Sequence, residues 1–364
     1  MPLKTVSGDH GALYKGRGAA QNPEGRFESQ RREGVDDGWS VAGESAANRP
    51  PSIVTEERVK SILSRNKSPD VPFAYSINPY RGCEHGCIYC YARPTHAYLN
   101  LSPGLDFETR IFAKVNAAER LREELARPGY KCETIAVGAN TDPYQPAERE
   151  WKITRSIIEV ASECRQPLGF VTKNALIERD LDLLVPMAEK RLAAVFVSVT
   201  TLDNDLARRL EPRASAPARR IEAIRRLAGA GVPVGVLVAP VIPFLTDSEM
   251  ERILEASRDA GASHAGYVLL RLPYEVRDLF RNWLLNHYPL KAEHVMSRVH
   301  QMRGGRDNDP AFGSRIRGEG EFARMLLHRF EMRCRQLGFE RDRVGLDCSQ
   351  LRPPRADGQL DLFR

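Results

Sequence analysis

From residue 73 onward, short β-branched segments alternate with amphipathic segments of helical period, and this alternation constrains the fold more than any other feature of the chain. Strands are predicted at 73–77, 134–137, 168–172, 194–199, 234–238 and 266–270. Helices are predicted between and after them at 115–126, 153–164, 176–190, 218–230 and 248–260. Repeated strand–helix units build a parallel sheet, so we expect an α/β fold with a partial (β/α)6 barrel. Ligands of such folds bind at the carboxyl ends of the strands.

Three of the seven cysteines fall within eight residues, directly after the first predicted strand. Cys83, Cys87 and Cys90 share a glycine-containing loop and can converge on one inorganic centre. Three thiolates leave one iron of a cubane 4Fe-4S cluster open, which suits a catalytic centre. A structural zinc site is the alternative, but it needs a fourth ligand, for which His85 and His96 are the nearby candidates. Three inert core thiols are the remaining interpretation.

The spacing C-x3-C-x2-C, with the aromatic residue Tyr89 before the last cysteine, resembles the motif of the radical S-adenosylmethionine (SAM) superfamily. The resemblance covers residues 70–275 and implies a partial barrel of the radical SAM type. The longer stretch from Ser76 to His96 is similar to the branch related to spore photoproduct lyase, a DNA repair enzyme.

This resemblance implies two cofactors, a 4Fe-4S cluster and SAM. Enzymes of the superfamily pass one electron into SAM, release methionine and a 5'-deoxyadenosyl radical, and use that radical to take a hydrogen atom from the substrate. The cofactors carry the difficult chemistry, while the protein supplies binding, orientation and redox tuning. The resemblance also implies an electron donor such as flavodoxin or ferredoxin.

Polar residues follow the second predicted strand. Asn140, Thr141 and Asp142 lie where the end of this strand should face the same rim as the cysteines. By resemblance to the second-strand SAM-binding segment of the superfamily, we expect these residues to contact the SAM amino group or ribose. The alternative is an Asx-type turn before a helix.

The third and fourth strands also end in polar residues. By resemblance, Lys173 and Ser198 supply a cation and a hydroxyl to the SAM carboxylate and ribose, and Glu211 and Arg213 are secondary candidates. For Ser198, ordinary β-rich sequence on a strand face is an equally good interpretation.

Two tyrosines, Tyr89 and Tyr91, flank Cys90. In spore photoproduct lyase, tyrosines flanking the last cluster cysteine help a cysteine on the second strand to return a hydrogen atom to the product, so the resemblance implies a catalytic role for both. The approximate position of that donor is Ala139 here. This departure argues against the same repair of thymine dimers and favours another substrate or another donor.

Composition places the chain among globular proteins outside membranes. Hydrophobic residues make up 42% of the chain, the mean hydropathy is -0.43, and no apolar run approaches the length of a membrane helix. The start of the sequence lacks the apolar stretch of a secretory signal. We therefore expect a cytoplasmic protein with reduced thiols.

Four parts are predicted along the chain. Residues 1–50 are polar and glycine-rich and are predicted as a flexible basic arm, with docking on the barrel as the alternative. Residues 55–275 form the core with the partial barrel, 276–348 form a helical C-terminal extension, and 349–364 form a Pro-rich linker with a terminal peptide motif.

The net charge of +6 is compatible with a polyanionic partner. Two regions, 208–226 and 297–317, are locally basic, and the second combines arginines with glycines and Phe312, a composition that can follow a phosphate backbone. Together with the family resemblance, these basic regions lead us to expect a radical SAM enzyme that acts on nucleic acid in the manner of DNA repair. The alternatives are a radical SAM enzyme acting on RNA or protein and a noncatalytic metal-cluster module that binds nucleic acid.

The last residues resemble the short motif with which bacterial DNA polymerases and repair proteins bind the sliding clamp. Gln359 would fix the register by hydrogen bonds, while Leu360, Leu362 and Phe363 would fill an apolar pocket. The alternative is an amphipathic terminus that packs on its own barrel.

Overall fold

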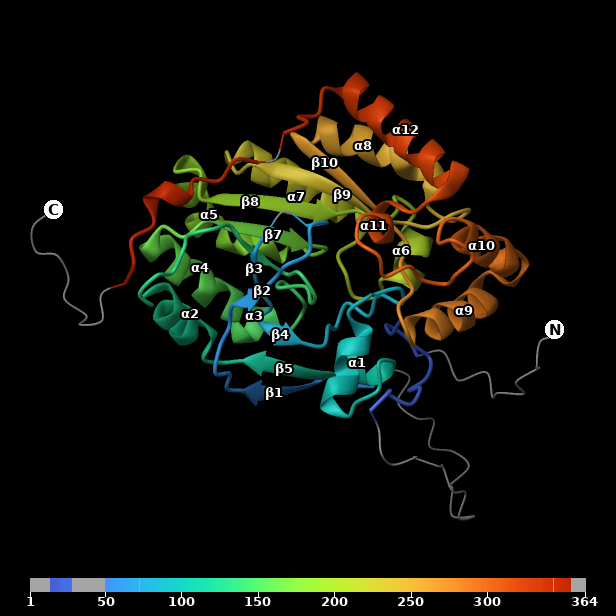
Figure 1. The fold of residues 1–364 in the computed structure, drawn as a ribbon, viewed down its shortest axis with the longest axis horizontal. Coiled ribbons are helices and arrows are strands. Elements are labelled where there is room, and N and C mark those ends of the chain that lie inside the picture. Colours follow the sequence, from blue (N-terminus) through green and yellow to red (C-terminus); the bar gives the residue numbers. More distant parts are fainter. Residues whose placement is uncertain (1–13, 28–49, 72, 343, 355–364) are drawn as a thin grey trace, which may run out of the picture.

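The computed structural model describes residues 14–27, 50–71, 73–342 and 344–354. A seven-stranded sheet with the order β10-β9-β8-β7-β6-β3-β2 forms the centre of the molecule (Figure 1). Its strands are β2 (Ser64–Arg65), β3 (Tyr75–Ile77), β6 (Ile135–Val137), β7 (Leu168–Thr172), β8 (Ala193–Ser198), β9 (Val234–Val241) and β10 (His264–Leu269).

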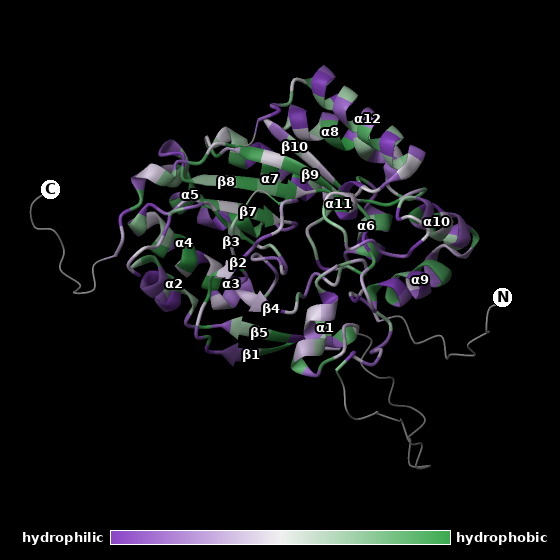
Figure 2. Cartoon of the chain, in the orientation of Figure 1, coloured by the Kyte–Doolittle hydropathy of each residue, from purple (hydrophilic) through white to green (hydrophobic). Residues whose placement is uncertain are grey.

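Six of these strands, β3 and β6 to β10, pair in parallel and follow one another in the sheet in chain order. β2 adds an antiparallel edge beside β3. Because consecutive parallel strands are joined by helical crossovers, this is the partial (β/α)6 barrel that the sequence predicts. Figure 2 shows that β8 and β9 are predominantly hydrophobic, as strands covered on both faces must be.

Helices cover the outside of the sheet, and α12 lies along the outer side of α8 (Figure 1). α4 is a typical covering helix, because its buried residues Ile153, Ile157 and Ala161 recur every four positions. The longer helices are α2 (Ala117–Leu125), α4 (Ile153–Cys164), α5 (Leu181–Glu189), α6 (Asn204–Leu210), α7 (Pro217–Gly229), α8 (Met250–Asp259), α9 (Val276–His287), α10 (Pro289–Gln301) and α12 (Gly320–Leu337). The short helical segments are η1 (Arg93–Leu99), α1 (Leu105–Thr109), α3 (Glu148–Trp151), η2 (Ala175–Asp180), η3 (Asp247–Glu249), α11 (Ser314–Arg317) and η4 (Cys348–Gln350).

A second sheet of three strands stands beside the barrel and was not predicted. Its order is β1-β5-β4, with β1 (Ile53–Glu57) parallel and β4 (Tyr80–Arg81) antiparallel to β5 (Arg110–Lys114). β4 and β5 bracket the cysteine-containing loop, η1 and α1. This sheet therefore holds both ends of the excursion that the chain makes between β3 and α2.

The described part of the predicted N-terminal arm, residues 14–27, is packed against this excursion. Arg17 and Ala19 are buried, and Ser102 Oγ donates to Pro23 O at 2.6 Å. The C-terminal motif with Gln359, Leu360, Leu362 and Phe363 lies outside the described residues.

Candidate active site

The cluster loop, residues 82–92, connects β4 to η1 and carries three free cysteines. Cys83 and Cys87 are buried and Cys90 is half-buried. Cys83 N–H donates to Phe107 O at 2.9 Å, and Cys90 N–H donates to Cys87 O at 3.2 Å. Backbone hydrogen bonds therefore set the relative positions of the three thiols.

The chemistry of these thiols fits an iron-sulfur cluster. Burial is the main cause that raises the pKa of Cys83, Cys87 and Cys90, so each remains a protonated thiol unless a cation stabilises its thiolate. Iron supplies that positive charge. Among the described residues, no three or more His, Cys, Asp or Glu side chains gather around the position of a single metal ion. A cluster does not need such a gathering, because its thiolates bind different iron atoms.

The two histidines considered as zinc ligands form other contacts. His85 Nδ1 lies 3.3 Å from Asp142 Oδ2, and His85 Nε2 lies 3.2 Å from Asn174 Nδ2. His96 Nε2 lies 2.9 Å from Arg110 O. Both ring nitrogens of His85 thus contact protein groups, which disfavours His85 as a fourth zinc ligand, whereas His96 uses only one of its ring nitrogens.

A buried ion pair, Arg93 with Glu108, stabilises the cluster loop. The Arg93 guanidinium donates to Cys87 O at 2.9 Å and to Gly86 O at 3.1 Å, and it pairs with Glu108 at 2.5 Å. Glu108 also accepts from Gly18 N–H at 3.0 Å, which joins the N-terminal segment to the loop. Both charged side chains are fully buried, and breaking such a pair costs about 3–5 kcal/mol. Neither residue is predicted as a site residue from the sequence, because an isolated Arg or Glu has no local pattern.

Asp142 follows β6 and connects it to the end of β7. Its carboxylate accepts from the Thr172 hydroxyl and from Lys173 N–H, both at 2.7 Å. It also accepts from Tyr144 N–H at 2.9 Å, so the Asx-type turn considered from the sequence is present. Burial alone would raise the pKa of Asp142, but His85 and these donors hold it below the usual value. Asp142 is therefore an ionised residue that ties two strand ends together.

The two residues before Asp142 differ in exposure. Thr141 is buried and its hydroxyl donates to Tyr80 O at 3.0 Å. Asn140 is exposed, and its backbone N–H donates to Asn78 Oδ1 at 2.8 Å. We call the edge formed by the carboxyl ends of the strands the rim. Asn140 is therefore exposed at the rim, whereas Thr141 and Asp142 stabilise the rim through hydrogen bonds to the protein.

The ammonium of Lys173 reaches across the ends of three strands. Nζ donates to Ser198 Oγ at 2.8 Å and to Thr200 Oγ1 and Ala239 O at 3.0 Å. Glu211 Oε1 also lies 3.0 Å from Nζ. The structure thus brings Lys173 and Ser198 together at the carboxyl ends of β7 and β8, the edge at which the sequence places them.

Glu211 is the buried carboxylate of this group. It accepts from Thr200 Oγ1 at 2.6 Å and pairs with the buried guanidinium of Arg220. The Tyr89 hydroxyl also donates to Glu211. Burial alone would raise the pKa of Glu211, but Arg220 and Lys173 hold it well below the usual value. Glu211 is therefore a carboxylate shared by two cations, Arg220 and Lys173, inside the barrel.

The two tyrosines of the cluster loop occupy different environments. Tyr89 is buried and points into the group around Glu211. Tyr91 is 44% exposed, and its hydroxyl donates to Ala139 O at the end of β6. Tyr91 is thus accessible from outside the barrel, whereas Tyr89 is enclosed.

Arg213 does not join the group around Lys173. Its Nη1 lies 2.8 Å from Glu84 Oε1 and 2.9 Å from Ser52 Oγ, and these residues line a separate cleft of about 500 Å³. The guanidinium turns this way because Glu84 offers it a carboxylate partner. The structure therefore does not place the Arg213 side chain beside Ser198.

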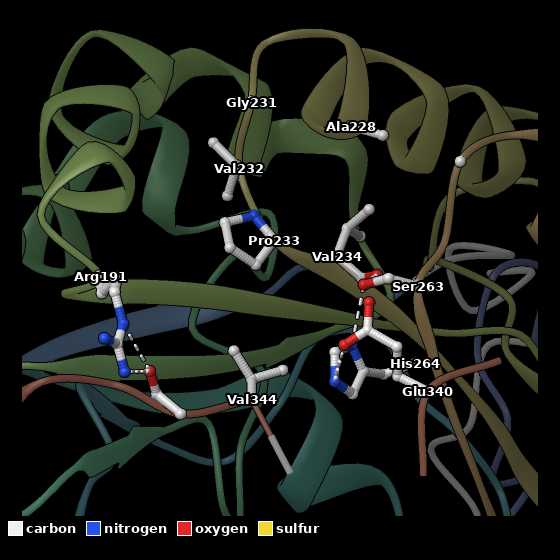
Figure 3. Close-up of a pocket in the computed structure, with 12 residues that line it drawn as sticks. Arg191, Ala228, Gly231, Val232, Pro233, Val234, Ser263, His264, Glu340 and Val344 are labelled. Atoms are coloured by element: carbon white, nitrogen blue, oxygen red, sulfur yellow. Dashed lines mark hydrogen bonds and ion pairs between the residues drawn. The ribbon is translucent and has the colours of Figure 1, made fainter. Parts of the chain in front are cut away.

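Another cleft, of about 430 Å³, lies at the opposite, amino-terminal end of the strands (Figure 3). Ser263 Oγ is 2.8 Å from His264 Nδ1, and His264 Nε2 is 3.4 Å from Glu340 Oε2. Across the cleft, Arg191 donates to Gly345 O at 3.1 Å. These contacts attach the chain after α12 to the sheet, and residues at this end of a β/α barrel contribute to stability.

Residues 77–256 match the family model of the Radical SAM superfamily. The chain belongs to this superfamily. The matched range contains the cluster loop and the strand ends that carry Asp142, Lys173 and Ser198. An uncharacterised protein of Mycobacterium tuberculosis (strain H37Rv) is 39% identical over 241 residues, which cover 65% of this chain and 71% of the relative. An uncharacterised protein of Methanocaldococcus jannaschii is 28% identical over 244 residues, which cover 66% and 86%.

Solved structures of spore photoproduct lyase share the fold of this radical SAM protein. One variant has a TM-score of 0.59 and 17% identity, with 86% of this chain and 87% of the other covered. A variant with bound AdoMet and dinucleoside spore photoproduct has a TM-score of 0.57 and 18% identity, with 79% and 80% covered.

The protein is therefore a radical SAM enzyme with a spore photoproduct lyase-like fold, and its cofactors are a 4Fe-4S cluster and SAM. In the part of the chain that the structure describes, no helix combines the length and the apolar character needed to cross a membrane.

Proposed function

We propose that this radical SAM enzyme acts on nucleic acid, in chemistry related to DNA repair. The shared fold supports the proposal, because one spore photoproduct lyase structure holds AdoMet together with a dinucleoside spore photoproduct. The observation from this chain that carries it is a group of exposed aromatic rings around Arg26, to which the N-terminal segment, η1 and the chain after β10 contribute.

The rings are placed for stacking. Phe27 and Tyr98 are 51% and 69% exposed, and their ring centroids are 5.1 Å apart. The Arg26 guanidinium lies 3.6 Å from the centroid of the Tyr274 ring, which is 64% exposed. Tyr98 belongs to η1, directly after the cluster loop, and Tyr274 follows β10. Exposed rings and guanidinium planes are the surfaces on which unpaired nucleic-acid bases stack.

In this proposal Cys83, Cys87 and Cys90 bind three of the four irons of the cluster. When bound and reduced, the cluster supplies the electron that cleaves SAM and so generates a radical able to take a hydrogen atom from substrate. The polar rim against which SAM binds consists of Asn140, Thr141, Asp142, Lys173 and Ser198. The buried ion pair of Glu211 and Arg220 beside this rim keeps water away from the reacting atoms.

The two tyrosines have separate roles in the proposal. Tyr91 faces the substrate because its ring is exposed beside Ala139, while Tyr89 is enclosed with Glu211. Ala139 has no thiol to return a hydrogen atom. We therefore propose a nucleic-acid reaction other than the thymine-dimer repair of spore photoproduct lyase, with electrons delivered by a donor such as flavodoxin or ferredoxin.

The experiment measures 5'-deoxyadenosine formed by the anaerobically reconstituted, chemically reduced protein with SAM. Single-stranded DNA or RNA should raise the rate over the protein alone, because a bound substrate couples SAM cleavage to turnover. Cys90→Ala should lose iron, visible absorbance and product. The matched control Cys334→Ala, which alters a half-buried thiol on α12, should retain all three. No stimulation by either nucleic acid, in protein that cleaves SAM, would contradict the proposal.

A further inference from the structure

Arg271 is a half-buried arginine that follows β10, at the same edge of the sheet as Lys173 and Ser198. Within the described residues its guanidinium has no hydrogen-bond or ion-pair partner, and its Nε is completely buried. Lys173 differs, since four protein oxygens surround its ammonium. Arg271 is thus a cation of the rim whose hydrogen-bonding capacity is not used by the described protein groups.

The surroundings of Arg271 are positively charged. Arg303 is 2% exposed and donates to Leu270 O at 2.7 Å and to Ser314 O at 2.8 Å, which fixes α11 beside the end of β10. Arg315 follows in α11 and is neutralised by Asp70 at 2.5 Å. Burial, and then the proximity of Arg271, lower the pKa of Arg303 to about 10. Asp70 pairs with Arg315 and acts on Arg271 only at longer range. Among the described residues, the fold therefore concentrates positive charge here, and no carboxylate forms an ion pair with Arg271.

The Arg271 guanidinium lies 5.3 Å from the centroid of the Tyr91 ring. Tyr91 directly follows Cys90 and is anchored by its hydroxyl to Ala139 O. A half-buried guanidinium without an acceptor is unfavourable in the free protein, and a bound anion removes that cost through charge-assisted hydrogen bonds. An anion at Arg271 would therefore be held beside the cluster loop.

We propose that Arg271, stacked on Tyr91, binds a phosphodiester group of the nucleic-acid substrate and thereby determines which nucleotide lies at the reacting centre. This inference rests on the proposed function. A planar guanidinium fork matches two phosphate oxygens, and the exposed ring beneath it can contact the adjoining nucleotide. The carboxylate of SAM is the competing anion, and the test separates the two.

The test uses the full-length protein with reconstituted cluster and SAM, and fluorescein-labelled single-stranded DNA of mixed sequence as the probe. By fluorescence anisotropy, Arg271→Gln should weaken DNA binding about tenfold, the loss expected for one charged hydrogen-bonded contact. The slope of the logarithm of the affinity against the logarithm of the salt concentration should fall in magnitude by about 0.7, the value for one phosphate contact on a single strand. Arg271→Lys, which keeps the charge and loses the fork, should lie between.

Arg191→Gln is the matched control, because this substitution removes the same charge at the opposite end of the strands (Figure 3). It should bind the probe like the unmodified protein. Equal DNA binding by Arg271→Gln and the unmodified protein would overturn the inference and leave the proposed function standing. Weakened SAM binding with unchanged DNA binding would assign the anion to SAM and also overturn it. Failure of the unmodified protein to bind both this probe and a labelled single-stranded RNA of the same sequence would overturn both.

Discussion

His96 is a buried histidine behind the cluster loop. It is 0% exposed, and a Cβ at Gly82 would lie 3.0 Å from its ring. Within the described residues its Nδ1 has no hydrogen-bond partner. Burial is the main cause that lowers the pKa of His96 from 6.5 to about 4. The folded protein therefore keeps this imidazole neutral at pH values where the unfolded chain protonates it.

We expect the free energy of unfolding to fall as the pH decreases from about 6.5 to about 4, because only the unfolded state binds a proton at His96 in this interval. The loss should amount to about 2 kcal/mol between pH 7 and pH 5. His96→Gln cannot be protonated and should flatten this part of the profile. Denaturant unfolding of both proteins at the two pH values measures the difference, and an equally steep loss in the variant would count against the assignment.

Single residues were predictable where family resemblance and strand position agree. Lys173 and Ser198 were predicted at neighbouring strand ends and are in direct contact. Arg213 was predicted at the same site, but Glu84 draws its side chain to another cleft. The partner of a long flexible side chain depends on contacts between segments far apart in sequence. For the same reason the importance of Arg271 emerges only from the absence of a partner among the described residues.

At the level of elements, helical and strand periodicity predicted the barrel well. α4 and β7 have the predicted bounds, because their buried positions follow a clear period. The segment 176–190 is divided into η2 and α5. β1, β4 and β5 were missed, since they have two to five residues and include exposed polar positions. Their pairing is long-range, and local periodicity does not report it.

The docked N-terminal segment offers a test at the same scale. A Cβ on Gly18 would lie 1.9 Å from Gly86 O, a backbone atom of the cluster loop that cannot easily move. Gly18→Ala should therefore displace residues 14–27 from the loop and lower the iron content after reconstitution. Hydrogen–deuterium exchange of the segment, together with iron analysis, measures both effects.

Gly25→Ala is the control for this experiment. A Cβ there would meet Ala97 and Leu101 at 3.4 Å, close to ordinary contact distance, so the segment should remain docked. If Gly18→Ala retained the same protection from exchange as Gly25→Ala, the described packing of the segment would be wrong.

For the whole molecule, the C-terminal motif outside the described residues leads to a separate prediction. A peptide of residues 352–364 should bind a bacterial sliding clamp weakly, because Leu360, Leu362 and Phe363 form a small apolar anchor after a linker. The double substitution Leu362→Ala, Phe363→Ala should abolish binding of the full-length protein and leave its iron content unchanged. Calorimetry that detects no association, or equal association by the double variant, would reject clamp binding by this motif.

For the whole molecule, we propose that a nucleic acid is the substrate of the radical chemistry. Its most direct test is the transfer of deuterium from a deuterated oligonucleotide to 5'-deoxyadenosine, measured by mass spectrometry after anaerobic reduction with SAM. We expect deuterium in the 5'-deoxyadenosine made by the unmodified protein, and a strong loss of that label in Arg271→Gln. Unlabelled 5'-deoxyadenosine from fully deuterated DNA and RNA, in protein that cleaves SAM, would contradict it.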